Sequence, residues 1–250
     1  MTIELSRRTL VAGAGGLLVA GCDKIAASPN VRKLLELGER ATFSAQRLVM
    51  DRAALAPEFG LAEMSPVFRV NGSSNPGTPE YGEHVASRFA NWRLAVDGLV
   101  TRPLSLSLTQ LRAAPSRTQI TRHDCVEGWS AIGQWTGTPL RLLLQLAGLH
   151  ASARYIVFHC ADLSGGRPYY ESIDLVDAMH PQTILAWAMN GQALSVPHGA
   201  PVRLRVERQL GYKHAKFVMR IEAVDSLARL YGGKGGYWED VAGYQWYAGI

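Results

Sequence analysis

The apolar residues occur mainly in short runs of strand length, and this distribution constrains the fold more than any other feature of the sequence. Such runs occur at 92–96, 155–161, 202–206 and 217–223, and the first is closed by Asp97-Gly98, which is typical of a strand that ends in a turn. The run 155–161 is apolar apart from His159, which predicts an interior strand. Helices are predicted at 31–50, 109–114, 138–148 and 175–180. Short strands with scattered helices predict an α+β fold with mixed β-sheets and not a doubly wound sheet.

The composition is that of a globular protein, with 47% apolar and 19% charged residues. The formal net charge is +5, but no run of Lys or Arg occurs beyond the N-terminus, so we expect no nucleic-acid partner. An anionic cofactor, or solubility alone, would account for the mild basicity. The three cysteines do not make a disulfide framework, and the absence of a Cys-x-x-Cys-His motif excludes an attached c-type haem.

The N-terminus has the pattern of an export signal. Arg7 and Arg8 precede the apolar run 10–20, which is too short for a membrane-spanning helix. Twin arginines at this position predict Tat export of a folded protein to the periplasm. The sequence Val-Ala-Gly-Cys at 19–22 resembles a lipobox, which predicts a lipid anchor on Cys22; the alternative is a signal cleaved nearby without lipidation. We therefore expect a signal at 1–22, a tether and helix at 23–65, and a catalytic domain at 66–250.

The stretch 121–135, TRHDCVEGWSAIGQW, is the strongest candidate for a functional site. Cys125 is followed two residues later by Glu127, and Trp129 and Trp135 supply bulky apolar side chains. Taken alone, a cysteine at a strand end is more often a buried structural thiol than a ligand. A soft thiolate beside a carboxylate, shielded by aromatic rings, is nevertheless what a buried metal or redox site requires.

The order Cys-Val-Glu-Gly-Trp-Ser, followed by Trp-Thr-Gly-Thr-Pro-Leu, resembles the molybdenum-ligand segment of the sulfite-oxidase superfamily. Within it, the Cys-x-Glu pattern is most similar to the periplasmic methionine-sulfoxide reductase catalytic subunits, and the resemblance extends over about residues 66–230. It implies a sulfite-oxidase-type molybdopterin-binding fold and a molybdenum-molybdopterin cofactor. It also implies that Cys125 is the protein ligand to the metal and that Glu127 is a catalytic proton relay.

The same resemblance implies further contacts to the cofactor. By position these are Asn71, Cys160, His198, Arg203, His214, Ala215 and Lys216. Two of them depart from the family pattern, because Cys160 replaces a threonine and His198 replaces an asparagine. Without the resemblance, His198 would be an ordinary loop histidine, Cys160 a core cysteine and Lys216 a solvated charge. No active-site tyrosine can be aligned, although Tyr169 and Tyr170 are near a strand edge.

These features predict a periplasmic molybdopterin-dependent oxidoreductase that transfers an oxygen atom. The substrate would be a small or protein-bound S- or N-oxide such as methionine sulfoxide, or else sulfite. Since the chain has no electron-transfer centre of its own, a membrane b-type cytochrome, a quinone or another redox partner would exchange electrons with it. Two alternatives remain: a Cys2His2 zinc protein using His123, Cys125, His159 and Cys160, or a lipoprotein binding module without catalysis whose aromatic tail contacts a partner.

Overall fold

The computed structural model describes residues 28–250, which form two compact units divided between Asp51 and Arg52. The predicted Tat signal and Cys22 lie outside the described residues. The described part of the first unit, residues 28–51, contains helix α2 (Pro29–Val49), close to the predicted bounds of 31–50. Within residues 28–250, no helix combines the length and the apolar character that a membrane crossing would need.

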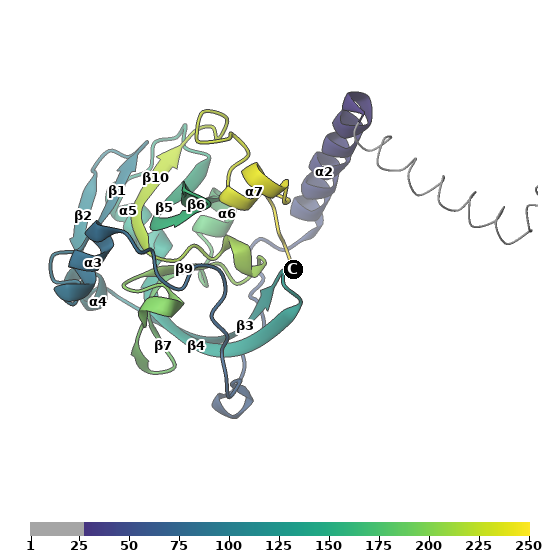
Figure 1. The fold of residues 1–250 in the computed structure, drawn as a ribbon. Coiled ribbons are helices and arrows are strands. Elements are labelled where there is room, and N and C mark those ends of the chain that lie inside the picture. The colour runs from purple at the N-terminus through teal and green to yellow at the C-terminus, as the bar shows by residue number, and fades with distance from the viewer. Residues whose placement is uncertain (1–27) are drawn as a thin grey trace, which may run out of the picture. The chain divides into compact units, whose positions relative to one another are not determined.

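The second unit is built on two β-sheets (Figure 1). The first has the strand order β2 (Leu104–Ser107), β1 (Arg93–Gly98), β10 (Val218–Val224), β5 (Tyr155–Ser164) and β6 (Arg167–Asp174). In it, β1 and β10 run parallel and the other neighbours run antiparallel. The second sheet is antiparallel, in the order β3 (Arg117–Cys125), β4 (Trp129–Pro139), β7 (Ile184–Met189) and β8 (Gln192–Ala193), and β9 (Arg203–Arg205) also pairs with β7.

The helices of the second unit are short, which confirms the predicted α+β class. They are η1 (Leu61–Glu63), α3 (Pro79–Ala86), α4 (Leu108–Ala113), α5 (Leu140–Ala147), α6 (Leu175–Ala178), η2 (Val196–His198), η3 (Gly211–Lys213) and α7 (Tyr237–Ala242). As predicted, α5 ends at Gly148, whose φ of +69° lies in the left-handed region that favours glycine.

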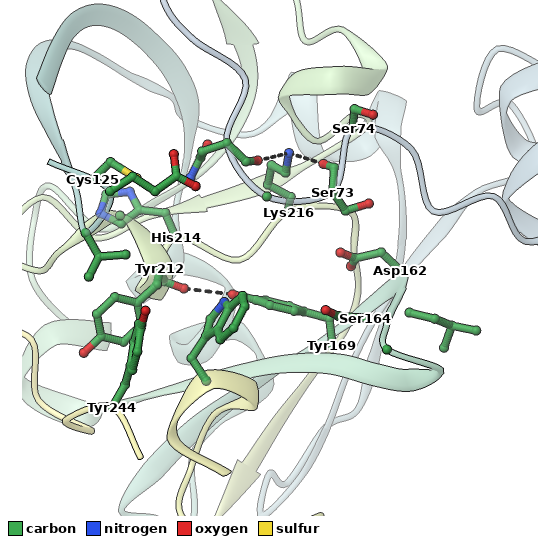
Figure 2. A pocket seen from close by; sticks show the side chains of 18 of the residues that line it. Ser73, Ser74, Cys125, Asp162, Ser164, Tyr169, Tyr212, His214, Lys216 and Tyr244 are labelled. Carbon is green, nitrogen blue, oxygen red and sulfur yellow. Dashed lines mark hydrogen bonds between the residues drawn. The ribbon is translucent and has the colours of Figure 1, made fainter. Parts of the chain in front are cut away.

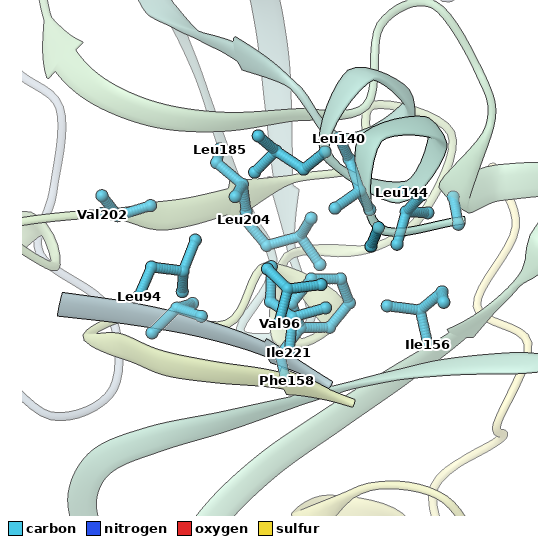
Figure 3. Packing of buried hydrophobic residues seen from close by; sticks show 14 of the residues in the cluster. Leu94, Val96, Leu140, Leu144, Ile156, Phe158, Leu185, Val202, Leu204 and Ile221 are labelled. Carbon is cyan, nitrogen blue, oxygen red and sulfur yellow. The ribbon is translucent and has the colours of Figure 1, made fainter. Parts of the chain in front are cut away.

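The main hydrophobic core lies between the two sheets (Figure 3). Leu94, Phe158 and Ile221 project from β1, β5 and β10, and Leu185 and Leu204 face them from β7 and β9. Helix α5 completes this layer with Leu140 and Leu144. Each fully buried side chain of this size contributes about 1.5–3 kcal/mol. The packing fixes the ends of both sheets relative to one another, and the candidate site lies at those ends.

One segment differs from the expectations and another takes part in the site. Residues 66–72 form no strand, and two of their carbonyls accept side-chain hydrogen bonds, from His198 at Phe68 and from Lys216 at Asn71. Residues 52–65 were grouped with the tether, yet they belong to the second unit. There, Glu58 forms a β-bridge with Thr121.

Candidate functional site

A cavity of about 640 Å³ opens where the ends of the two sheets meet the longer loops (Figure 2). Its lining comes from segments that are far apart in the sequence. They are the loop 71–75, the β3–β4 turn at 125–127, the β5–β6 hairpin at 162–165 with Tyr169, the η3 region at 211–216, and Trp238 and Tyr244 near the C-terminus. The volume is within the range of small-molecule and cofactor sites.

Cys125 is the last residue of β3 and lies at the edge of this cavity. It pairs with Trp129 across the β3–β4 turn, which Gly128 allows with a φ of +84°. The Cys125 side chain is buried, and this burial raises the pKa of its thiol. A backbone hydrogen bond from Glu127 opposes the shift, whereas the charge of the Glu127 carboxylate adds to it. A metal cation would reverse this balance by stabilising the thiolate.

Glu127 lines the cavity two residues after Cys125. Its carboxylate accepts a hydrogen bond of 2.9 Å from the indole Nε1 of Trp129. Because Trp129 is held in β4, this bond orients the carboxylate beside the thiol. The site therefore combines a thiol with an oriented carboxyl group that can accept or donate a proton.

A buried polar layer supports Cys125 from behind. His123 is 1% exposed, and its Nδ1 accepts a hydrogen bond of 2.9 Å from Arg205. Arg205 pairs through two bonds with Glu207, and its guanidinium lies 4.3 Å from the ring centroid of Trp135. Gly211 approaches so closely that a Cβ there would be 2.5 Å from His123 Nε2. Substituting Gly211 would therefore displace η3 or the histidine.

Lys216 is 7% exposed and lines the cavity. Its ammonium donates to the carbonyls of Asn71 at 2.7 Å, Pro197 at 2.9 Å and Ser73, and Figure 2 shows the bond to Ser73 as one of two dashed lines at Lys216. An ammonium has three donors, so all are used. Burial, with the nearby charge of Arg203, lowers the pKa of Lys216 to about 7.

Arg203 is fully buried behind the cavity lining. It donates to the carbonyls of His198 at 3.1 Å and His214 at 3.5 Å, and burial and Arg205 lower its pKa to about 9. Among residues 28–250, no carboxylate forms an ion pair with Arg203 or Lys216. Two buried cations without a paired anion are costly, so the arrangement fits a ligand that carries negative charge.

Two acceptors in the cavity lining are buried without a hydrogen-bond partner. His214 donates from Nε2 to the Gln209 carbonyl at 3.0 Å, which leaves Nδ1 as the unsatisfied acceptor. Burial lowers the pKa of His214 well below its usual value, so the ring is neutral. Asp162 is 4% exposed and its Oδ1 has no partner. Burial raises the Asp162 pKa to about 6. In Figure 2 its carboxylate points toward Lys216 and the cavity.

The donor set agrees with the chemistry of a molybdopterin. A cysteine sulfur at one end can serve as a soft metal ligand. The buried positive charges suit a terminal phosphate, and the unpartnered acceptors of His214 and Asp162 suit the N–H groups of a pterin ring. The residues present therefore fit this cofactor.

The structure brings together five of the nine predicted site residues. Asn71, Cys125, Glu127, His214 and Lys216 line the cavity. The other four do not line it: Cys160, Ala215 and Arg203 are packed behind the lining, and His198 donates to the Phe68 carbonyl at 3.3 Å.

Cys160 is the clearest of these departures. Its side chain packs against the main hydrophobic core, and its Sγ lies 3.9 Å from the carbonyl oxygen of Phe158 in the same strand. The thiol does not line the cavity, as expected of an ordinary core cysteine.

Sequence reasoning missed several residues of the lining. These are Asp162, Tyr212, Trp238 and Tyr244, whereas Tyr169 was noted without a role. The available signal for Asp162 was its position, because it is a charged residue directly after the apolar run 155–161. The C-terminal tail is rich in aromatic residues, but nothing in its sequence indicates that it returns to the cavity.

The zinc alternative is not supported by the geometry. Within residues 28–250, no three His, Cys, Asp or Glu side chains gather in a way that could hold a metal ion. His159 is engaged elsewhere, with Nε2 at 2.9 Å from Glu222 and Nδ1 at 2.8 Å from the Tyr231 hydroxyl. The four proposed zinc ligands therefore do not converge.

Comparison with known proteins gives a consistent result. The oxidoreductase molybdopterin binding domain family matches residues 81–231. A protein of Azospira oryzae, provisionally named protein-methionine-sulfoxide reductase subunit YedZ1, is 39% identical over 94% of this chain and 83% of its own length. The protein-methionine-sulfoxide reductase catalytic subunit MsrP of Ralstonia nicotianae is 38% identical over 54% of this chain and 44% of its own.

A solved structure is also similar. The sulfane dehydrogenase SoxCD from Paracoccus pantotrophus matches with a TM-score of 0.51 and 27% sequence identity, over 54% of this chain and 39% of that one. The match agrees with the sulfite-oxidase-type fold that the sequence predicted.

Proposed function

The chain belongs to the oxidoreductase molybdopterin-binding family and is an enzyme with a molybdenum-molybdopterin cofactor, and we propose that it reduces S-oxides such as methionine sulfoxide by oxygen-atom transfer. The names of its two relatives support this substrate class. The observation that carries the proposal is the charge of the cavity lining around Cys125.

The lining suits a neutral substrate better than an oxyanion. Its charged members are Glu127, Asp162 and Lys216. Lys216 is the single Lys or Arg of the lining, and the phosphate of the cofactor would already use its charge, so the lining offers no further cation to an anionic substrate. Sulfite would therefore meet two carboxyl groups without compensation, whereas a sulfoxide carries no net charge. This favours S-oxide reduction over sulfite oxidation.

The roles of the residues follow from their positions. Bound molybdopterin supplies two-electron redox chemistry. Cys125 would ligate the metal through its sulfur. Glu127, oriented by Trp129, would hold one of the two protons with which the oxygen leaves as water, beside the Cys125 sulfur, and solvent would supply the other. The protein's contribution is thus a fixed ligand and a fixed proton donor.

The remaining predicted residues would hold the organic part of the cofactor. Asn71, His214 and Lys216 line the cavity and could contact it directly. Arg203 would contribute its charge from behind the lining. Cys160, His198 and Ala215 would shape the site indirectly, through the backbone that carries the contacting residues.

We also propose the cellular context. The signal at 1–22 would direct Tat export to the periplasm, with a lipid anchor on Cys22, and the catalytic domain would follow a tether. A membrane b-type cytochrome or a quinone would supply electrons. The naming of the Azospira relative as a subunit supports a partner of this kind.

The test is metal analysis and turnover of the purified protein. We expect molybdenum and pterin in equal amounts, reduction of methionine sulfoxide with a reduced dye, and no oxidation of sulfite. Cys125→Ser should abolish both turnover and the molybdenum electron paramagnetic resonance signal. Cys160→Ser is the matched change, because that thiol does not line the cavity. Zinc in place of molybdenum, sulfite oxidation, or unchanged turnover in Cys125→Ser would each contradict the proposal.

A further inference from the structure

Aromatic rings form one wall of the cavity. Tyr212, Trp238 and Tyr244 all line it. The rings of Trp238 and Tyr244 stack with centroids 5.7 Å apart and an interplanar angle of 23°. Tyr212 meets Tyr244 edge-on at 5.1 Å and 75°. In Figure 2, Tyr212 and Tyr244 lie on the side of the cavity that holds Cys125 and His214, away from Asp162. Tyr212 follows Gly211, where a Cβ would lie 3.2 Å from the Asp124 carbonyl oxygen, one residue before Cys125, so the wall begins next to the reactive end.

The wall is anchored, although most of it comes from the C-terminal segment. Helix α7 contributes Glu239, which pairs with the fully buried Lys213 at 2.5 Å. The Tyr237 hydroxyl donates to the Ser164 carbonyl at 2.9 Å. The Tyr212 hydroxyl donates to a backbone carbonyl of the C-terminal segment, at residue 245, over 2.6 Å. These contacts fix the ring positions before any substrate arrives, which lowers the entropic cost of binding.

The chemistry of the wall suits an apolar substituent. Trp238 and Tyr244 are only partly buried, so their rings remain accessible from the cavity. Sulfur and alkyl groups pack favourably on aromatic rings, with about 0.3–1.5 kcal/mol for a sulfur contact. A substrate with only methyl groups would leave most of this surface uncovered.

We propose that Trp238 and Tyr244 form the subsite that holds the alkyl or aryl substituent of the S-oxide. The inference rests on the proposed function, since it assigns specificity within that reaction. It predicts a preference for sulfoxides with a side chain of the size of methionine or a phenyl ring over dimethyl sulfoxide.

The test compares two substrates in the loaded holoenzyme. We expect Trp238→Ala and Tyr244→Ala each to lower kcat/KM for methyl phenyl sulfoxide about tenfold, as for loss of an apolar pocket contact. The value for dimethyl sulfoxide should change much less. Calorimetric binding of methyl phenyl sulfone, which is not turned over, should weaken to a similar extent. Tyr231→Ala is the matched control, because Tyr231 is exposed and does not line the cavity.

The possible results distinguish a failure of the aromatic subsite from a failure of the proposed S-oxide reduction. The subsite would be overturned if kcat/KM fell equally for both substrates. It would also be overturned if neither the ratio of the two kcat/KM values nor sulfone binding changed. Trp238→Phe keeps an aromatic ring, so it should retain most of the preference for methyl phenyl sulfoxide over dimethyl sulfoxide. This variant shows whether the effect of Trp238→Ala comes from the lost ring or from a failure to fold. If no S-oxide is reduced by the wild-type enzyme, the proposed function fails, whereas sulfone binding still reports on the wall.

Discussion

Lys213 and Lys216 are three residues apart and both buried, yet their surroundings are opposite. Lys213 is fully buried between Glu171, at 2.6 Å, and Glu239, at 2.5 Å. Burial alone would lower its pKa, but the two carboxylates outweigh burial and raise it. Lys216 has three carbonyls and no carboxylate partner, and its pKa falls to about 7.

This difference separates a structural cation from a cation suited to a ligand. The charge of Lys213 is neutralised within the protein, and the pair with Glu239 connects η3 to α7. The charge of Lys216 lacks a paired carboxylate, so an added anion would stabilise it. A buried cation without a paired counterion is thus a stronger sign of a binding site than burial or charge alone.

The largest effect should come from breaking the Lys213 cluster. Lys213→Met would leave Glu171 and Glu239 buried without a cation, and loss of one partner of a buried pair costs about 3–5 kcal/mol. We expect this decrease in the free energy of unfolding of the cofactor-free protein in urea. Lys234→Met, at an exposed lysine, is the control and should change little. A decrease below about 1 kcal/mol for Lys213→Met would contradict the structural role.

A smaller effect should appear in the pH dependence of stability. The folded protein releases the Lys216 proton near pH 7, whereas the unfolded chain keeps it to about pH 10.4. Between these values the unfolded state binds more protons, so stability rises with pH. Relative to Lys216→Met, the wild type should gain more than about 1 kcal/mol from about pH 7 to about pH 10. If the difference in unfolding free energy between the wild type and Lys216→Met did not change over this pH range, the Lys216 ammonium would not be destabilised by its burial.

The sequence was sufficient for the parts of the fold that short-range patterns determine. The end of α5 at Gly148 follows from a local cap signal. A strand was predicted over 117–121, and β3 continues four residues further, to Cys125. The position of Arg203 was not predictable in this way. Strand β9 has only three residues, all buried, so alternation could not show which face Arg203 occupies.

The aromatic wall was hidden for a different reason. Trp238 and Tyr244 reach the cavity through long-range contacts, such as the Lys213–Glu239 pair and the backbone hydrogen bond from residue 210 to residue 248. Such pairings depend on how the whole unit packs, and no local pattern encodes them. Asp162 was missed for a similar reason, since its burial results from the elements around it.

The smallest effect on stability should come from Lys216→Met. Three hydrogen bonds to carbonyls are lost, each of about 0.5–1.5 kcal/mol, but the cost of burying the ammonium is also removed. We expect these contributions to offset, so that the unfolding free energy of the cofactor-free protein at about pH 7 stays within about 1 kcal/mol of the wild type. Cofactor content should nevertheless fall, because the site loses the charge that suits an anion. Pterin fluorescence per protein measures this loss, with Lys234→Met as the matched control. Full pterin content in Lys216→Met would erase the distinction between the two lysines.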